Sequence, residues 1–230
     1  MNIGALGIII QARTKSTRFP NKVLYQLSGK KVIEHIVEEC KKVKNANIFV
    51  AVPNNDIDTF KFLYPKYDIV VFGGDEENVL YRYYYLASSY KLETIIRITS
   101  DCPCLSSEII EGVINFYQNN NFDYCSNMTI THATKAEDAH NHTSDTLLSD
   151  GFSCEIFSGE ALKQAFKNTT DKYGKEHVTS WIKNNLKCGL YDKGFMYLYG
   201  KFSLDEQLDL EAIEAFDILR RKGFIKYGER

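Results

Sequence analysis

Hydrophobic and polar positions along the chain follow two different periods. Short apolar runs rich in Ile, Val and Phe alternate with longer segments in which apolar residues recur every three or four positions. The first pattern is typical of buried strands and the second of amphipathic helices. Within 30–43, for example, Ile33, Ile36, Val37 and Cys40 share one helical face. Strands are predicted at 5–10, 47–52, 68–72, 94–99, 122–126, 152–157 and 195–202, and helices at 30–43, 56–63, 76–90, 107–117, 160–166, 175–184 and 206–221.

The repeated alternation of strand and helix predicts an α/β fold with a mostly parallel sheet. No linker-like stretch and no internal repeat divides the sequence, so residues 1–230 are expected to form one domain. One segment, at about 128–150, is polar and irregular. A loop of that length in a compact domain usually has a functional role. It contains His132, His140 and His142, whose spacings do not indicate a metal site by themselves.

Composition narrows the classes of partner. The chain has 28 lysines and arginines against 30 acids, a net charge of -2, with 44% hydrophobic residues. These values are ordinary for a globular domain and exclude disorder, collagen and coiled coil for the chain as a whole. They favour neither nucleic acid nor membrane as a partner, so a charged ligand would need a local cluster.

The cysteines and the first residues of the sequence indicate the cellular compartment of the protein. The six cysteines form no C-x-x-C pair, and a core of this size needs no disulfides, so we expect reduced thiols and a cytoplasmic protein. The apolar run at 1–10 is short and has no basic residue before it. We therefore expect neither a signal peptide nor a membrane span there.

The most informative loop follows the first predicted strand. Between positions 13 and 22 it carries four cations and no acid, together with three hydroxyl side chains. Ligands of open α/β sheets bind beyond the carboxyl ends of the strands. Arginine and lysine there suit a polyphosphate, although composition alone leaves a solvated basic loop equally open. The cations are Arg13, Lys15, Arg18 and Lys22.

Two common phosphate-binding motifs are absent from the sequence. No G-x-x-x-x-G-K-[ST] occurs, and no G-x-G-x-x-G follows a strand, since Gly4 and Gly7 precede or begin the first one. A Walker-type NTPase and a nicotinamide or flavin site are therefore not expected.

The loop pattern I-Q-A-R-x-x-S-T-R-x-P-x-K-V-L at 10–24 resembles the start of the cytidylyltransferases of spore-coat polysaccharide biosynthesis. That family is related to the enzymes that activate 3-deoxy-manno-octulosonate (KDO) with CTP. Seven motifs in register are specific to the family, though not to its substrate. The other six are GGDEENVLYRY at 73–83, RITSDCPCL at 97–105, DYCSN at 123–127, GFSCEIF at 151–157, EHVT at 176–179 and LDEQLDL at 204–210.

The resemblance implies a three-layer, Rossmann-like nucleotidyltransferase fold of the GT-A-like type and a homodimer. It implies a Mg²⁺-dependent reaction in which an acceptor oxygen attacks the α-phosphate of CTP and pyrophosphate leaves. The acceptor would be a sugar acid or a small phosphorylated metabolite. The product would be CMP- or CDP-linked, for surface polysaccharide or related biosynthesis. Two alternatives stay open, a nucleotidyltransferase for another NTP and a non-catalytic nucleotide-binding regulator.

The resemblance also implies roles for individual residues. The catalytic set is Arg13, Lys22 and Asp101, the metal ligands are Asp101 and Asp205, and the acceptor would contact Glu155 and His177. The nucleotide would contact Ala12, Arg13, Ser16, Thr17, Arg18, Lys22, Asn78, Arg82 and Thr99.

Several of these residues have simpler alternative roles. Asp101 could cap a turn and Asp205 the last helix. His177 could be a structural histidine. Arg97, inside an apolar strand, needs either a structural ion pair or a ligand as its partner. His35, on the first predicted helix, is expected at the surface. A row of tyrosines, interpreted mainly as packing, lies at Tyr81, Tyr83, Tyr84 and Tyr85.

The sequence also departs from the family pattern. Thr14 and Lys15 stand where the family usually has Met-Gly, which adds charge to the loop. Ser153 replaces the aspartate of G-x-D-x-E, so we expect an unusual acceptor. The segment at 128–150 is longer than expected for the family, and we expect it to close over the acceptor as a lid.

Overall fold

The computed structural model describes residues 4–128, 151–191 and 202–223 of the 230. Two sequence predictions therefore lie largely outside the described residues. One is the lid at 128–150 with its three histidines, and the other is the strand at 195–202.

The centre of the molecule is a sheet in which the described residues form seven strands in the order β5-β4-β1-β6-β8-β7-β9. The four strands β5, β4, β1 and β6 are parallel, β8 is antiparallel to both of its neighbours, and β9 is parallel to β7. This confirms the mostly parallel sheet. The strands are β1 (Leu6–Gln11), β4 (Ala46–Pro53), β5 (Val70–Gly74), β6 (Thr94–Thr99), β7 (Tyr124–Ser126), β8 (Glu155–Ser158) and β9 (Cys188–Leu190).

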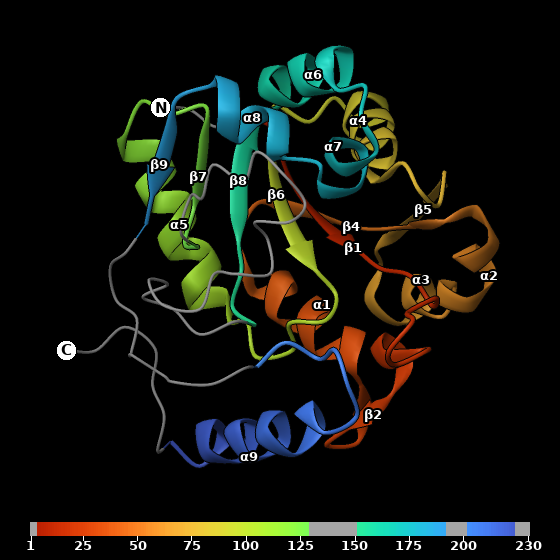
Figure 1. The fold of residues 1–230 in the computed structure, drawn as a ribbon. Coiled ribbons are helices and arrows are strands. Elements are labelled where there is room, and N and C mark those ends of the chain that lie inside the picture. Colours follow the sequence, from red (N-terminus) through yellow and green to blue (C-terminus); the bar gives the residue numbers. More distant parts are fainter. Residues whose placement is uncertain (1–3, 129–150, 192–201, 224–230) are drawn as a thin grey trace.

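Helices cover both faces of the sheet and make three layers (Figure 1). Side chains alternate along a strand, so Ile8 and Ile10 of β1 join one core cluster while Ile9 joins the other. The first cluster includes residues of α1 (Val32–Lys42), α5 (Ser107–Asn119) and α9 (Asp209–Arg221). The second includes residues of α4 (Val79–Ser89), α6 (Gly159–Asn168) and α8 (Ser180–Asn185), and α7 (Lys172–His177) packs against α4.

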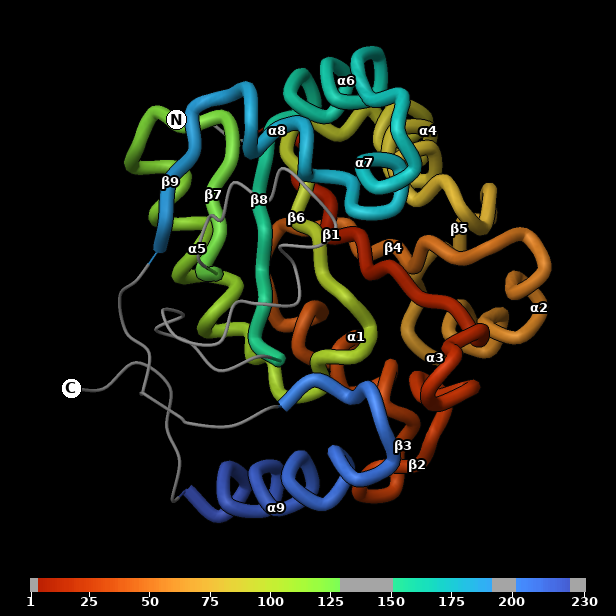
Figure 2. Tube along the Cα trace, viewed as in Figure 1, coloured from red at the N-terminus to blue at the C-terminus, as the bar shows by residue number. Residues whose placement is uncertain are grey.

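Smaller elements complete the described part of the chain. After β1 the chain passes through a short 3-10 helix, η1 (Lys22–Leu24), and a hairpin of β2 (Gln26–Leu27) and β3 (Lys30–Lys31). Beside the edge strand β5 lie η2 (Asn54–Asp56), α2 (Ile57–Phe60) and α3 (Leu63–Tyr67). In Figure 2 the trace of α9 runs along the side opposite α6. No helix among the described residues is long and apolar enough to cross a membrane.

Some local expectations were wrong. His35 is buried, because the hairpin covers this face of α1 and its Leu27 carbonyl bonds to the ring Nε2 at 2.8 Å. The helix expected at 56–63 is divided into α2 and α3. The helix expected at 175–184 is divided too, into α7 and α8. β9 and the β2–β3 hairpin, both short, were not predicted.

Candidate active site

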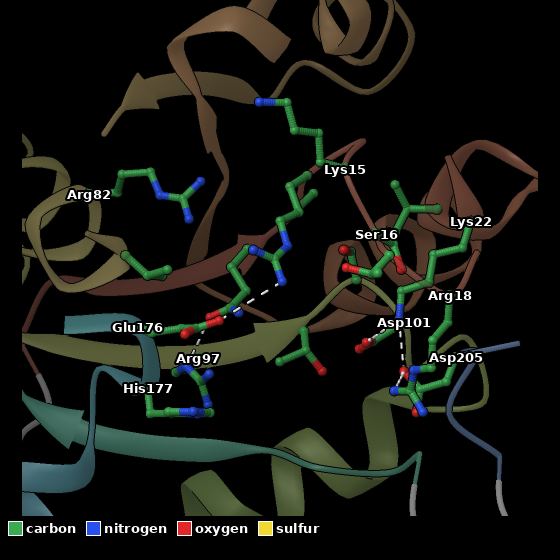
Figure 3. A pocket seen from close by; sticks show the side chains of 18 residues that line it. Lys15, Ser16, Arg18, Lys22, Arg82, Arg97, Asp101, Glu176, His177 and Asp205 are labelled. Atoms are coloured by element: carbon green, nitrogen blue, oxygen red, sulfur yellow. Dashed lines mark hydrogen bonds and ion pairs between the residues drawn. The ribbon is translucent and has the colours of Figure 1, made fainter. Parts of the chain in front are cut away.

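A pocket of about 420 Å³ lies beyond the carboxyl ends of β1 and β6 (Figure 3). It brings together eleven of the thirteen predicted site residues, from five separate parts of the chain, and leaves out Asn78 and Glu155. Seven further residues line it: Gln11, Lys15, Val23, Val79, Arg97, Ser100 and Glu176. The predicted residues that line it are Ala12, Arg13, Ser16, Thr17, Arg18, Lys22, Arg82, Thr99, Asp101, His177 and Asp205.

The cationic loop after β1 is pinned at its first turn. The backbone N–H and the hydroxyl of Thr14 both donate to the carboxylate of Asp56, each at 2.7 Å. The backbone N–H of Asn21 donates to the Thr14 carbonyl at 2.8 Å, and Asn21 itself adopts a left-handed conformation with φ 60°. Asp56 thus acts on the loop rather than on its own helix. Sequence reasoning missed this residue because 42 positions separate it from Thr14.

One lysine holds the two predicted metal ligands together. The Nζ of Lys22 lies 2.8 Å from Asp101 Oδ2 and 3.1 Å from Asp205 Oδ1. Arg18 Nη2 approaches the same oxygen of Asp205 at 3.1 Å. The backbone also joins here, because the N–H of Leu204 donates to the Asp101 carbonyl at 2.7 Å. Figure 3 shows these side chains converging from three segments of the chain.

The donor chemistry of this cluster suits a hard divalent cation. Mg²⁺ binds through one or two carboxylates and completes its shell with phosphate oxygens and water. Asp101 and Asp205 supply two carboxylates that converge on a single point, the Lys22 ammonium. Within the described ranges, no group of three or more His, Cys, Asp or Glu side chains could hold a metal alone. A metal here would therefore depend on ligands from a bound phosphate.

Arg82 is a buried cation with no salt bridge to any described residue. The residue is 2% exposed, and in the described part of the chain its Nε and Nη1 have no hydrogen-bond partner. Burial lowers the pKa of its guanidinium. The close packing against β5 requires a glycine at position 74, where a Cβ would lie 2.5 Å from Arg82 Cγ. A guanidinium buried this way at a pocket wall lacks an anionic partner, which a bound ligand would supply.

Asn78, a predicted nucleotide contact, and two neighbouring tyrosines have structural roles. Asn78 caps the start of α4, and its Oδ1 accepts from the Tyr81 backbone N–H at 2.9 Å. Tyr83 is buried and donates to the Ile9 carbonyl at 3.0 Å, while Tyr84 stacks on Phe166 with ring centroids 4.1 Å apart. The tyrosines placed by these contacts are packing residues, as interpreted from the sequence.

Arg97 makes the structural ion pair that was one of its two sequence alternatives, and its side chain also lines the pocket. It pairs through Nη1 with Glu155 and donates from Nε to Gln11 Oε1 at 3.1 Å. Glu155, on the neighbouring strand, is 5% exposed and lies beside the pocket rather than lining it.

Glu155 is the centre of a buried network. Its carboxylate also accepts from Tyr124 at 2.7 Å, from the Thr179 hydroxyl at 2.9 Å and from Lys183 Nζ at 2.8 Å. Burial alone would raise the pKa of this carboxyl, but Lys183 and Arg97 hold it well below its ordinary value. The Glu155 carboxylate is therefore charged at neutral pH and forms ion pairs with two cations, Arg97 and Lys183.

His177 ends α7 next to a strained turn. Burial lowers the pKa of its imidazole, so the ring is neutral at pH 7, and it packs on Tyr173 with centroids 4.2 Å apart. The next residue, Val178, has φ 57° and ψ -56°, and the Thr179 N–H donates back to the His177 carbonyl at 2.5 Å. This is a γ-turn of the rare, strained kind. Strained backbone of this sort clusters at functional sites. Here it lies between His177, which lines the pocket, and Thr179, which donates to Glu155.

Comparison with known proteins identifies the family. The model of the Cytidylyltransferase family matches residues 7–224. The chain belongs to this family. It is therefore a nucleotidyltransferase, and both the resemblance and the enzyme class expected from the sequence are confirmed.

Individual relatives agree with this assignment. An uncharacterised protein of Methanocaldococcus jannaschii is 36% identical over 179 residues, covering 77% of this chain and 66% of its own length. The spore coat polysaccharide biosynthesis protein SpsF of Bacillus subtilis is 28% identical, covering 96% and 87%. A 3-deoxy-manno-octulosonate cytidylyltransferase of Neisseria meningitidis is 24% identical, covering 93% and 83%. The solved cytidylyltransferase of Leptospira borgpetersenii, 20% identical with a TM-score of 0.77 and 98% of each chain covered, has the same fold.

The Glu155 network predicts a specific stability defect. Glu155→Gln leaves Arg97 and Lys183 without their anion, which should lower the free energy of unfolding at pH 7 by about 3–5 kcal/mol. Because the folded-state pKa lies below the unfolded one, the stability from Glu155 is present at neutral pH and is lost as the pH falls below about 4.5. Urea unfolding at pH 7 and pH 4 measures both effects. The exposed Glu160→Gln is the control, and an E155Q variant as stable as this control would contradict the network's role.

Replacing Arg82 should make the ligand-free protein more stable but weaken its binding of CTP. Arg82→Met removes a desolvated charge, so the ligand-free protein should gain about 1–3 kcal/mol in unfolding free energy. The same variant should lose most of the thermal stabilisation by CTP. Lys172→Met, at an exposed pair with Glu77, is the control. A variant that is less stable yet fully stabilised by CTP would show that Arg82 is structural.

Proposed function

We propose that the protein is a Mg²⁺-dependent cytidylyltransferase that uses CTP and transfers CMP to a small acceptor, a sugar acid or a phosphorylated metabolite. The observation that carries the proposal is the charge of the pocket. Six cationic side chains and three carboxylates line it within the described residues, an excess of three positive charges. Two of the carboxylates share the Lys22 ammonium. A triphosphate with one bound cation matches this combination.

The residues of the loop after β1 would bind the triphosphate. Arg13 and Arg18 are half-exposed and can reach phosphate oxygens, and the hydroxyls of Ser16 and Thr17 add donors. Lys22 would exchange a carboxylate for a phosphate oxygen when the nucleotide enters. Mg²⁺, held by Asp101 and Asp205, would neutralise charge on the phosphate oxygens.

The transfer itself needs positioning more than covalent chemistry. A bond forms between the acceptor oxygen and the α-phosphorus, and the bond from that phosphorus to the bridging oxygen of the β-phosphate breaks. Pyrophosphate leaves with the electron pair of the broken bond, and a hydroxyl acceptor loses its proton to water. Arg13 and Lys22 would stabilise the charge that develops on the leaving group.

The carbohydrate role of the product is carried over from SpsF and the KDO enzyme, whose names place them in polysaccharide and sugar-acid chemistry. A homodimer is part of the same proposal and is tested by light scattering. The non-catalytic alternative is disfavoured because the pocket holds both metal-ligand candidates in contact with Lys22.

A thermal-shift panel of the four NTPs with Mg²⁺ tests the nucleotide. A ligand that binds only the native state raises the unfolding temperature, and the proposal predicts the largest shift with CTP. An equal or larger shift with UTP, GTP or ATP would support the rival nucleotidyltransferase instead.

Pyrophosphate release tests catalysis and the metal role. Asp101→Asn should abolish Mg²⁺-dependent release in the presence of CTP and pooled sugar acids and sugar phosphates, because half of the metal's protein ligands lose their charge. Asp75→Asn, in the turn before α4 and outside the pocket lining, is the control. Near-normal release by the D101N variant would reject the metal role.

A further inference from the structure

A second, smaller hollow adjoins the nucleotide pocket. Its volume is about 110 Å³, which leaves room for one carboxylate or phosphate group and not for a nucleotide. Arg97 and His177 line both hollows, so they form the wall between them. The remaining lining residues come from α7, the strained turn and α8: Tyr173, Thr179, Ser180, Lys183 and Asn184.

The side chains of this hollow carry an excess positive charge. Among the described residues, Arg97 and Lys183 pair with a single carboxylate, that of Glu155, and they contribute two positive charges against its one. His177, which burial keeps neutral at pH 7, adds none. A partly buried cation without a matching anion is costly. The hollow therefore favours an anionic group.

Lys183 is the side chain best placed to bind such a group. The side chain of Lys183 is 28% exposed, whereas that of Arg97 is 14% exposed and that of Glu155 only 6%. Its Nζ lies over the ring of Tyr124 at 5.4 Å from the centroid, and it has three donors, of which Glu155 takes one. Ser180 and Asn184, three positions before it and one after, add a hydroxyl and an amide from the same short helix.

We propose that this hollow binds the anionic group of the acceptor, and that Lys183 is the residue that selects for it. The inference rests on the proposed function and adds the acceptor's charge and the side chain that recognises it. The anionic group of the acceptor would lie between Lys183 and Arg97. The reacting oxygen of the acceptor would then extend past Arg97 and His177 into the nucleotide pocket. Glu155 is a positioning residue, because it touches both cations and is closed off from solvent. The anionic group of the acceptor is a carboxylate or a phosphate, because both bind the same cations.

The test measures pyrophosphate release with saturating CTP and Mg²⁺ and three acceptors: 3-deoxy-manno-octulosonate for a carboxylate, mannose 1-phosphate for a phosphate, and mannose as the neutral arm. One charged acceptor should react with the wild-type protein and mannose should not. Lys183→Met should raise the KM for that acceptor by about 10- to 100-fold. The KM for CTP should stay within about 2-fold, because Lys183 does not line the nucleotide pocket.

Controls separate recognition from folding. Lys163→Met, an exposed lysine on α6 that pairs with Glu160, should behave as wild type. Lys183→Arg should restore part of the lost affinity, since it keeps the charge. Ser180→Ala leaves the Glu155 network intact and should still raise the acceptor KM by about 3- to 10-fold, the loss expected for one hydrogen bond. The Ser180→Ala variant therefore still tests the proposal if K183M fails to fold.

The outcomes distinguish the two proposals. An unchanged acceptor KM in both K183M and S180A would overturn the subsite while leaving the cytidylyltransferase intact. Equal rises in KM for CTP and acceptor, or a preference for mannose, would overturn it as well. If wild-type protein releases no pyrophosphate, titration calorimetry of the two charged acceptors into the CTP complex decides. Binding by wild type but not by K183M would keep the subsite and sink the catalytic proposal, and no binding by wild type would sink the subsite.

Discussion

The salt bridge that Lys22 makes to Asp101 and Asp205 is the constraint on which the rest of the site depends. Asp101 and Asp205 lie 79 and 183 positions after Lys22 in the chain. Lys22 follows β1, Asp101 follows β6, and Asp205 precedes α9. One ammonium, with its side chain 12% exposed, holds them together. Two carboxylates brought this close would repel each other without a cation between them. In the proposed function, the metal and the phosphates of the nucleotide would replace the Lys22 ion pairs at these carboxylates.

A second charge cluster, around Glu155, organises the other half of the site. Here the carboxylate is buried and the cations Arg97 and Lys183 are the groups that face cavities. The antiparallel strand β8 places Glu155 directly opposite Arg97 of β6, in register. The two clusters thus have opposite designs. One presents carboxylates that can receive a cation, and the other presents cations that can receive an anion.

Sequence reasoning predicted what is local and periodic. The strand at Thr94–Thr99 was predicted end to end because its β-branched run is interrupted only by Arg97. Eleven of the thirteen residues that the family motifs predicted for the site line one pocket, those of the loop after β1 among them. What sequence reasoning missed depends on contacts between distant segments. The Thr14–Asp56 clamp spans 42 positions, and the burial of His35 depends on a hairpin of two-residue strands. The break at Val178 follows from a backbone conformation that β-branched residues rarely adopt.

The central claim is that Asp101 and Asp205 hold a divalent cation only together with the nucleotide. Mn²⁺ in place of Mg²⁺ tests it directly by electron paramagnetic resonance, because bound Mn²⁺ loses its free signal. The account predicts weak Mn²⁺ binding to the protein alone and one tightly bound ion per chain with CTP present. In the Asp205→Asn variant the extra binding over that of CTP itself should disappear. Tight Mn²⁺ binding without CTP, or unchanged binding in the variant, would contradict the account.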